Sequence, residues 1–296
     1  MKRLVALLLV ATAFAANRIA PDPAYISEYD KWKTERLDDL KQNWIPLVGL
    51  YWLKPGANSF GSDPSNDIAL PAGSAPSKAG AFDFQDGAVT VKLEPGVIGK
   101  VGSAAVTMAK LTADNDKGQK PAVLEMGSLR LHVIKRGQRT GIRVKDVNSA
   151  ALRSIKPMDF YPVDLNYRVI ATWVPADGKK TVDVPTEIGD VSHTVIPGEL
   201  RFTLNGKEMT LTALSGSPEK SLFIVFNDAT KQIDTYPAGR FIDTPPVKDG
   251  KVVLDFNRAY NPPCAFTPYA TCPLAPKENR LSVAIPAGEK YENKAH

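Results

Sequence analysis

The sequence predicts a mostly β protein, sandwich-like or barrel-like with antiparallel strands, built as two β subdomains with one N-terminal helix packed on them. Turn signals such as Pro55-Gly56, Asp86-Gly87 and Asn205-Gly206 recur about every 8–12 residues. Apolar and polar residues alternate between them, as in the run 129–134. Of the 296 residues, 43% are apolar and 24 are proline, which suits many short strands around a buried core.

The first residues have the layout of a secretory signal peptide. Lys2 and Arg3 precede the apolar run 4–11, and Ala13-Phe14-Ala15 is a small-x-small cleavage site. We expect residues 1–16 to be removed and the protein to be periplasmic or secreted, although an uncleaved N-terminal anchor is an alternative. No second long apolar run follows, so no membrane span is expected after cleavage.

The net charge also limits the partners. It is +5, or +3 without Lys2 and Arg3, and the surplus is spread along the chain. Nucleic-acid binding needs a concentrated basic surface, so a nucleic-acid partner is not expected.

A helix is predicted over residues 22–44, within an N-terminal helical segment 17–46. Asp22 is a suitable N-cap, Pro23 suits the first turn, and Pro46 ends the pattern. Apolar side chains recur at spacings of three to five, at Tyr25, Tyr29, Trp32, Leu37 and Leu40. This pattern favours a helix that docks on the β body over one that binds a partner.

The β region is predicted as two subdomains, residues 47–150 and 151–296, with no flexible linker between them. In the second, Asn205-Gly206 separates two alternating runs and predicts a tight hairpin, because both turn positions need a positive φ. The strand-forming stretches expected in this subdomain are 160–173, 181–204, 207–226, 233–241 and 251–256.

Motifs for well-known chemistry are absent. The chain contains no Gly-x-Ser-x-Gly elbow, no Gly-x-x-x-x-Gly-Lys loop, no Gly-x-Gly-x-x-Gly after a strand and no His-Glu-x-x-His. The histidines are His132, His193 and His296, too far apart in the chain to suggest a metal site. Neither a metal nor a cofactor is therefore expected.

The segment Phe60–Leu70, which contains Asn66-Asp-Ile-Ala-Leu70, resembles the first loop of forkhead-associated domains. The later Asp86-Gly87 and the run 129–133 after Gly127 continue the likeness. The resemblance implies a β-sandwich for 47–150. Those domains bind phosphothreonine, but Ser62 occupies the position of their phosphate-contacting arginine and the sequence after Ser77 lacks their Ser-x-x-His pair. Phosphopeptide binding is therefore not expected.

The C-terminal segment carries a second resemblance. The strings are Gly239-Arg-Phe241, Asp255-Phe-Asn-Arg-Ala-Tyr-Asn-Pro-Pro-Cys264, Cys272-Pro273 and Glu278-Asn-Arg280. They are similar to a bacterial family of unknown function, number 1684 among such domains, and the stretches 49–53, 60–63 and 142–143 also fit. The resemblance covers most of the mature chain, yet it implies no activity.

The same segment supplies the candidate site residues. Arginine, asparagine and tyrosine side chains crowd a loop that four prolines stiffen, which suits the binding of a small anionic or polar ligand, either a small molecule or a peptide. The alternative is that these groups only satisfy the loop's own backbone. The candidates are Arg240, Asp255, Asn257, Arg258, Tyr260, Asn261, Asn279 and Arg280.

An enzymatic function is the competing hypothesis for the same segment. A hydrolase or transferase site would combine Arg240, Asp255, Arg258, Tyr260 and one cysteine. The two cysteines themselves, Cys264 and Cys272, are expected to form a disulfide, because the chain is expected to be exported and they are close in sequence. A thiolate activated by Arg258 or Arg280 is one alternative. A two-cysteine metal site is another, but it lacks further ligands.

Overall fold

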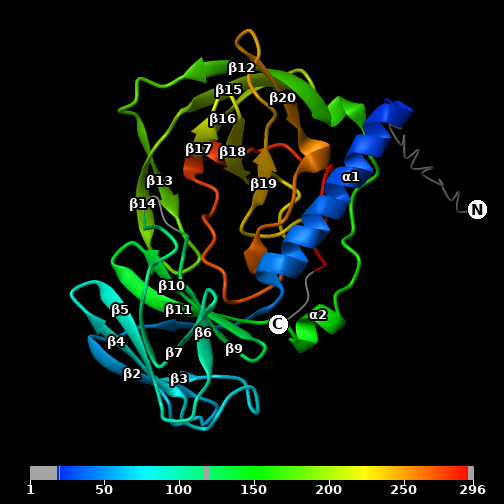
Figure 1. Cartoon of the computed structure of the whole chain (residues 1–296). Helices are drawn as coiled ribbons and strands as arrows, with labels where there is room; N and C mark the ends of the chain where they lie inside the picture. Colours follow the sequence, from blue (N-terminus) through cyan, green and yellow to red (C-terminus); the bar gives the residue numbers. More distant parts are fainter. Residues whose placement is uncertain (1–18, 20, 117–119, 293–296) are drawn as a thin grey trace, which may run out of the picture.

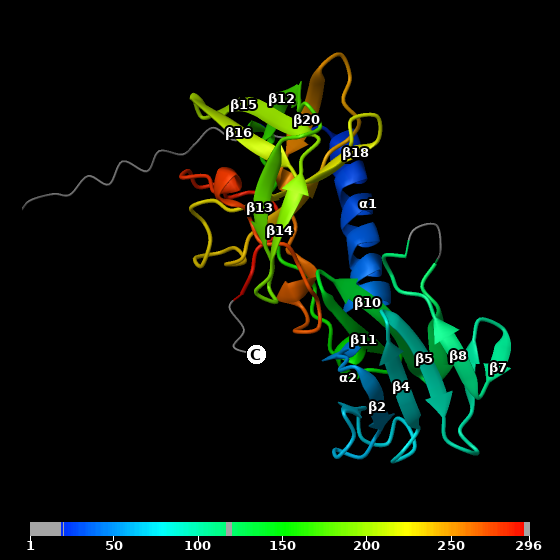
Figure 2. The same ribbon diagram turned by 90° about the vertical axis from the view of Figure 1, so that its left-hand side faces the viewer.

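The computed structural model describes residues 19, 21–116 and 120–292, so the predicted signal peptide lies outside the described residues. It shows two β lobes with one long helix running beside the second lobe and reaching the first (Figures 1 and 2). The mostly β prediction is confirmed. No helix in the described part of the chain is long and apolar enough to cross a membrane.

The helix α1 (Pro23–Asp39) confirms the predicted N-terminal helix, and it passes into a π-helical turn, η1 (Leu40–Trp44). The Asp22 carboxylate accepts the N–H of Tyr25 at 2.7 Å and caps the first turn. Tyr29 and Trp32 pack edge-on against Phe160, with ring centroids 6.2 and 5.9 Å apart. These aromatic contacts hold α1 on the segment that connects the two lobes.

The first lobe contains two sheets that enclose one apolar core. The strand orders are β1-β11-β10-β9-β6-β7 and β3-β2-β4-β5-β8. The strands are β1 (Leu47–Trp52), β2 (Gly56–Gly61), β3 (Ile68–Ala69), β4 (Gly80–Gln85), β5 (Ala88–Leu93), β6 (Gly99–Val101), β7 (Ala104–Val106), β8 (Met108–Leu111), β9 (Val123–Met126), β10 (Leu129–Arg136) and β11 (Arg139–Asp146). Leu129, Leu131 and Val133 all face the core, as their alternation predicts.

The second lobe follows the short helix α2 (Ala150–Arg153) and the 3-10 turn η2 (Leu165–Tyr167). A four-stranded sheet, β16-β15-β12-β20, packs on a three-stranded sheet, β17-β18-β19, and β13 and β14 form a separate hairpin. The strands are β12 (Arg168–Pro175), β13 (Thr181–Pro185), β14 (Val191–Val195), β15 (Gly198–Leu204), β16 (Lys207–Ala213), β17 (Ser215–Ser217), β18 (Ser221–Phe226), β19 (Arg240–Asp243) and β20 (Lys251–Asp255).

The predicted hairpin at Asn205-Gly206 is confirmed. Asn205 and Gly206 have φ of 52° and 74°, and Leu204 pairs with Lys207 across the turn. The expected strand 233–241 is mostly wrong, because the chain before Arg240 forms turns. The Asp228 carboxylate accepts the backbone N–H and the hydroxyl of Thr230 at 2.7 and 2.5 Å, and these local bonds replace strand pairing.

The C-terminal segment after β20 has little regular structure except three 3-10 turns, η3 (Phe256–Arg258), η4 (Pro263–Ala265) and η5 (Lys277–Asn279). Buried side chains fix it to the sheets. Arg240 is 1% exposed; it pairs with Asp228 at 2.6 Å and donates to the carbonyls of Ile285 and Ala287. These bonds tie β19 to the end of the segment.

The two cysteines lie together in a small core cluster of the second lobe. The N–H of Cys264 donates to Sγ of Cys272, and the N–H of Cys272 donates to Sγ of Cys264, both at 3.3 Å. Both are free thiols in this structure. The disulfide therefore stays a prediction, for which the side-by-side placement is suitable.

The buried Asp228–Arg240 pair should be essential for stability. Asp228→Ala leaves the Arg240 guanidinium buried without its counter-charge, so we expect a loss of roughly 3–5 kcal/mol in the free energy of unfolding. Glu35→Ala is the control, because it removes only the exposed Lys31–Glu35 pair at 3.8 Å and should change little. Urea denaturation followed by circular dichroism measures both; similar losses in the two variants would contradict the assignment.

The disulfide can be tested on protein purified without reductant. We expect intact-mass spectrometry to show one hydrogen missing per cysteine, and dithiothreitol to lower the unfolding free energy by roughly 2–3 kcal/mol. A Cys264→Ser/Cys272→Ser double variant should be insensitive to dithiothreitol. Two titratable thiols in the air-exposed, unfolded wild type would show that the bond does not form.

Candidate functional site

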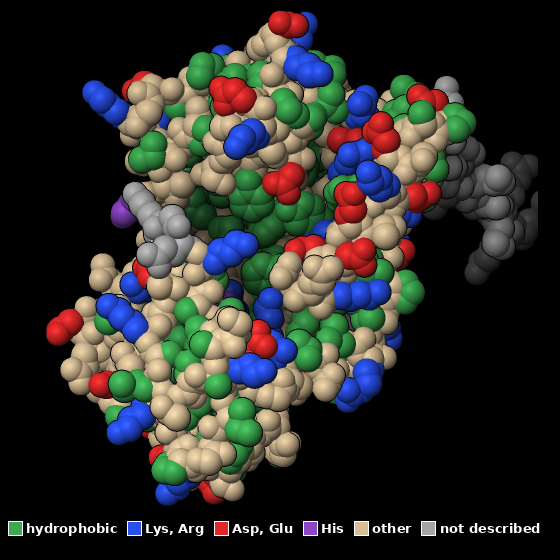
Figure 3. Space-filling model, in the orientation of Figure 1, with side chains coloured by type: hydrophobic (Ala, Val, Ile, Leu, Met, Phe, Trp, Pro, Cys, Tyr) green, Lys and Arg blue, Asp and Glu red, His purple; other side chains and the backbone are tan. Residues whose placement is uncertain are grey.

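A cleft of about 740 Å³ lies between the second lobe and α1. Figure 3 shows that this face of the molecule is hollowed, with hydrophobic side chains at the bottom of the hollow and charged ones around it. The cleft is lined by Glu28, Arg168, Ile170, Asp243, Thr244, Pro245, Pro246, Lys248, Lys251, Val252, Val253, Asp255 and Arg258.

Strand register builds one wall of the cleft. In the β12–β20 pair, Arg168 lies opposite Asp255 and Ile170 lies opposite Val253. Residues directly opposite in an antiparallel pair point to the same face, so these four side chains share the outer face of the sheet. Ile170 is 57% exposed there, which gives the wall an apolar patch beside the charged end.

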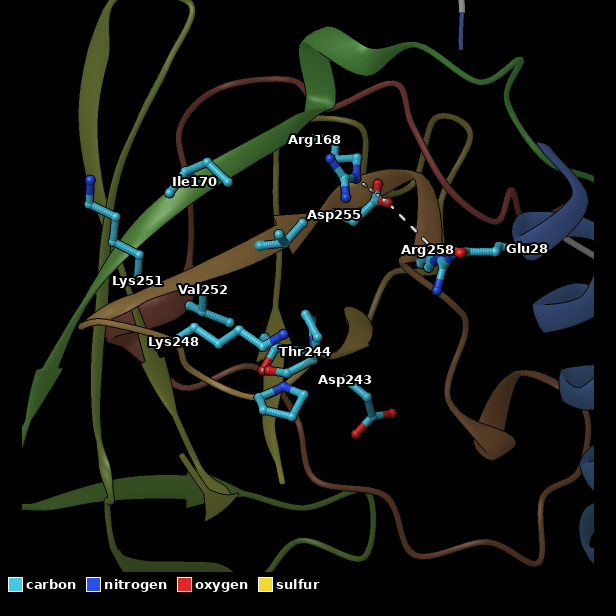
Figure 4. Close-up of a pocket in the computed structure, with 13 residues that line it drawn as sticks. Glu28, Arg168, Ile170, Asp243, Thr244, Lys248, Lys251, Val252, Asp255 and Arg258 are labelled. Atoms are coloured by element: carbon cyan, nitrogen blue, oxygen red, sulfur yellow. Dashed lines mark hydrogen bonds and ion pairs between the residues drawn. The ribbon is translucent and has the colours of Figure 1, made fainter. Parts of the chain in front are cut away.

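Asp255 organises the charged end of the cleft (Figure 4). Its side chain is 9% exposed and its Oδ2 lies 3.6 Å from Nε of Arg168 and 3.9 Å from Nε of Arg258. The hydroxyl of Tyr25 on α1 donates to the same oxygen at 2.8 Å. Burial, and then the Asp255 charge, raise the pKa of Tyr25, so this hydroxyl stays a donor.

Both guanidinium groups are held further by α1. They lie 5.7 and 5.8 Å from the centroid of the Tyr25 ring, and Nη2 of Arg258 lies 3.5 Å from a carboxylate oxygen of Glu28. Nε of Arg258 is buried and has no hydrogen-bond partner among the described residues. Two positive groups therefore share one buried carboxylate and keep donors unused.

Asp243 extends into the cleft from the end of β19 (Figure 4). The Tyr260 hydroxyl donates to its Oδ2 at 2.5 Å and fixes the carboxylate. Burial, followed by the Asp243 charge, raises the pKa of Tyr260. Lys248 and Lys251 complete the charged lining, and no described carboxylate lies within ion-pair distance of either.

Three of the sequence-predicted residues meet at this cleft. Asp255 and Arg258 line it directly, and Tyr260 reaches it through Asp243. Arg280 does not: it is exposed, and its Nε contacts the carbonyl of Ala275 at 3.4 Å. Asn261 lines a different cavity.

The remaining candidates serve the interior of the fold. Asn257 is 1% exposed and bonds the N–H and the carbonyl of Asp164, both at 3.0 Å. Asn279 is fully buried; it accepts the N–H of Thr212 and donates to two carbonyls. With Arg240, these residues match the alternative in which polar groups only satisfy the backbone.

The polar residues at the cleft that sequence reasoning missed include Tyr25, Glu28, Arg168, Asp243, Lys248 and Lys251. Arg168 becomes a neighbour of Asp255 only through strand register, and Tyr25 only through the docking of α1. Asp243 comes two residues after the Gly-Arg-Phe string, which was a usable signal. Lys248 lies beside the turn Asp249-Gly250, and the sequence around it predicts a turn but does not mark Lys248 as a site residue.

Neither cysteine lines this cleft, and the structure does not bring Arg240 into it. The described part of the chain has no group of three side chains suited to hold a metal ion. His193 pairs with Asp183 at 2.5 Å on the exposed β13–β14 hairpin. Burial lowers the pKa of His132, on β10, to about 4. Neither histidine lines the cleft, whose lining offers carboxylates, arginines and lysines for chemistry. The hydroxyls of Tyr25 and Tyr260 donate to two of these carboxylates.

Among solved structures, the chain is similar to an uncharacterized protein of Haloarcula marismortui determined by solution NMR. That match has 30% identity, covers 48% of this chain and 80% of the other, and has a TM-score of 0.40. The FHA domain of FhaA, solved in complex with the intracellular domain of Rv3910, matches at 15% identity over 32% of this chain and 97% of that domain, with a TM-score of 0.23. No curated protein matches the chain.

A family model described as "Protein of unknown function (DUF1684)" matches residues 153–290. This range contains the whole C-terminal segment, with Asp255, Arg258 and Tyr260, and also Arg168 and Asp243. The chain is therefore similar to this family of proteins of unknown function over residues 153–290, less than half of its length. The stretches 49–53, 60–63 and 142–143 lie outside the match, so the expectation that the resemblance covers most of the mature chain is not confirmed.

Proposed function

We propose that the cleft binds a small molecule that carries a carboxylate or a phosphate. The observation that supports this most directly is the pair of guanidinium groups, Arg168 and Arg258, held around the single buried carboxylate of Asp255. Arginine presents a planar fork of donors that matches both anion types. Across the whole lining, four cations (Arg168, Arg258, Lys248 and Lys251) face three carboxylates (Glu28, Asp243 and Asp255), so the cleft keeps a surplus of one positive charge.

The rest of the lining limits the ligand further. Lys248 and Lys251 add positive charge, and Tyr260 already engages the acid Asp243. Beside these groups lie Ile170, Val253, Pro245 and Pro246, which offer apolar surface. A volume of about 740 Å³ is in the range of ordinary small-molecule sites. We therefore propose an anionic ligand with an apolar portion, and not a bare inorganic ion.

We also propose where the ligand is met, on the basis of the N-terminal sequence. The signal-peptide pattern in residues 1–16 supports export, so we propose that the ligand is met in the periplasm or outside the cell. Mass spectrometry of the periplasmic fraction tests this proposal, and a mature chain that still begins at Met1 would contradict it.

A hydrolase or transferase is the second candidate, and the Tyr260–Asp243 contact favours it. The 2.5 Å hydrogen bond fixes a carboxylate that extends into the cleft, which suits a general base. Arg168 and Arg258 would stabilise negative charge that develops on the substrate. Because neither cysteine lines the cleft, this version uses no thiol nucleophile.

The binding proposal predicts that Arg258→Gln weakens anion binding by roughly ten-fold or more, because a charge-assisted hydrogen bond is lost. Isothermal titration calorimetry with hexanoate, citrate and phenyl phosphate measures it. Arg280→Gln is a matched control, since it removes the same charge from an exposed position of the same segment. The proposal fails if no anion binds the wild type, or if both variants lose affinity equally.

The enzymatic candidate predicts a different result for Asp243→Asn. If Asp243 is a general base, turnover of p-nitrophenyl acetate should fall by roughly 10²–10⁴ while hexanoate binding persists. A wild type without turnover, or an unchanged rate in the variant, would eliminate this candidate and leave the binding proposal in place.

A further inference from the structure

A second cavity, of about 540 Å³, shares no lining residue with the cleft. Three parts of the chain enclose it: the residue after η1, the segment from α2 to residue 159, and the C-terminal segment. The lining residues are Ile45, Ala151, Ser154, Ile155, Lys156, Pro157, Met158, Asp159, Asn261, Ala265, Phe266, Glu289, Lys290, Tyr291 and Glu292.

Two buried polar residues, Asn261 and Glu289, contribute to the lining. They are 2% and 1% exposed. The N–H of Asn261 donates to Oε2 of Glu289 at 2.9 Å, and Nδ2 of Asn261 donates to the carbonyl of Lys290 at 2.8 Å. Oδ1 of Asn261 is buried and has no partner among the described residues. The polar wall therefore has an acceptor that the protein leaves unused.

Backbone geometry holds Glu289 in this place. Gly288 has φ of 83°, and a Cβ there would lie 2.5 Å from the carbonyl oxygen of Ala259. Only glycine fits such a close approach. The N–H of Glu289 then donates to that carbonyl at 2.8 Å, and the side chain is directed to Asn261.

Glu289 has no cation within ion-pair distance among the described residues, although charged groups surround it. These groups are Arg36 and Tyr29 on α1, Arg240 on β19, and Lys290 and Asp159 at the rim. These three cations each have another partner: Arg36 lies 3.3 Å from Asp39, Arg240 lies 2.6 Å from Asp228, and Lys290 lies 3.4 Å from Asp159. Lys156, the other lysine of the lining, is exposed and lies beyond ion-pair distance of Glu289.

Burial raises the pKa of Glu289 to about 7, and the nearby Arg36 opposes this only in part. A buried carboxyl without a paired cation is unusual, because ionising it in a poorly solvated place costs free energy. A bound cation would offset that cost. Two further buried atoms near this carboxyl, the Tyr29 hydroxyl and Nε of Arg36, also have no partner in the described structure.

We propose that this cavity is a second ligand site, which binds the ammonium group of a primary amine with an apolar tail. The ammonium would donate to the Glu289 carboxylate and to Oδ1 of Asn261. The tail would lie along Ile45, Met158 and Phe266, which are apolar parts of the lining. A carboxylate ligand would meet Glu289 with like charge, and an alcohol would offer one donor to two acceptors.

The site can be tested with three probes of similar shape: hexylamine, hexanol and hexanoate. We expect hexylamine to bind the full mature chain by calorimetry at least ten-fold more tightly than hexanol. Any binding of hexanoate belongs to the cleft and should be unchanged by Glu289→Gln. Glu289→Gln should abolish the preference for the amine. This variant removes a buried charge and should fold, which circular dichroism verifies. Glu219→Gln changes an exposed acid that lines neither cavity; it is the control and should keep the preference.

The pH dependence gives a second measurement. Hexylammonium keeps its charge below about pH 9, because alkylamines titrate near the value of lysine. Binding requires ionised Glu289, so its affinity should be about thirty-fold weaker at about pH 5.5 than at about pH 8. Equal binding of amine and alcohol, or a pH dependence that survives Glu289→Gln, would overturn the proposal. Neither outcome depends on whether the cleft beside Asp255 binds an anion.

Discussion

The buried ion pair between Arg240 and Asp228 is the constraint on which the second lobe depends. The guanidinium group is 1% exposed and donates both to the Asp228 carboxylate and to two carbonyls near the chain's end. A long segment with little regular structure can be buried only if its backbone groups find partners. Arg240 provides them from β19, and the reciprocal backbone bonds of Phe241 and Tyr260, at 2.8 and 2.9 Å, continue the attachment.

The helix α1 depends on this arrangement and in turn completes both cavities. Its Tyr25 hydroxyl donates to Asp255, and its Arg36 donates to the carbonyl of Asn261 at 2.7 Å. Glu28 then lies at the cleft, and Ile45, just beyond the helix, lies at the second cavity. An N-terminal element and a C-terminal segment, far apart in sequence, are therefore parts of the same two sites (Figure 1).

The two cavities have opposite electrostatic character. The lining of the cleft has four cations and three carboxylates, and its two lysines have no ion-pair partner in the described structure; this surplus of one charge supports the proposed anion. In the second cavity, the buried carboxyl of Glu289 has no cation within ion-pair distance among the described residues, and this supports the proposed ammonium group. Each site is organised by a buried carboxylate: Asp255 draws two guanidinium groups to the cleft, whereas Glu289 has no cation within ion-pair distance. Burial makes such charges matter more than they would at the surface.

The sequence by itself determined the elements that depend on local chemistry. The capped helix, the Asn205-Gly206 hairpin and the core-facing alternation of β10 follow from side-chain periodicity and backbone preference, and all are present. It also singled out Asp255, Arg258 and Tyr260. Only the tertiary structure decided which polar side chains are bonded inside the fold and which line a cavity. Arg240, Asn257 and Asn279 are used up inside the fold, whereas Arg168 and Asp243 enter the cleft through strand pairing. A polar side chain's role depends on the partners that distant segments bring to it, and local sequence does not contain those partners.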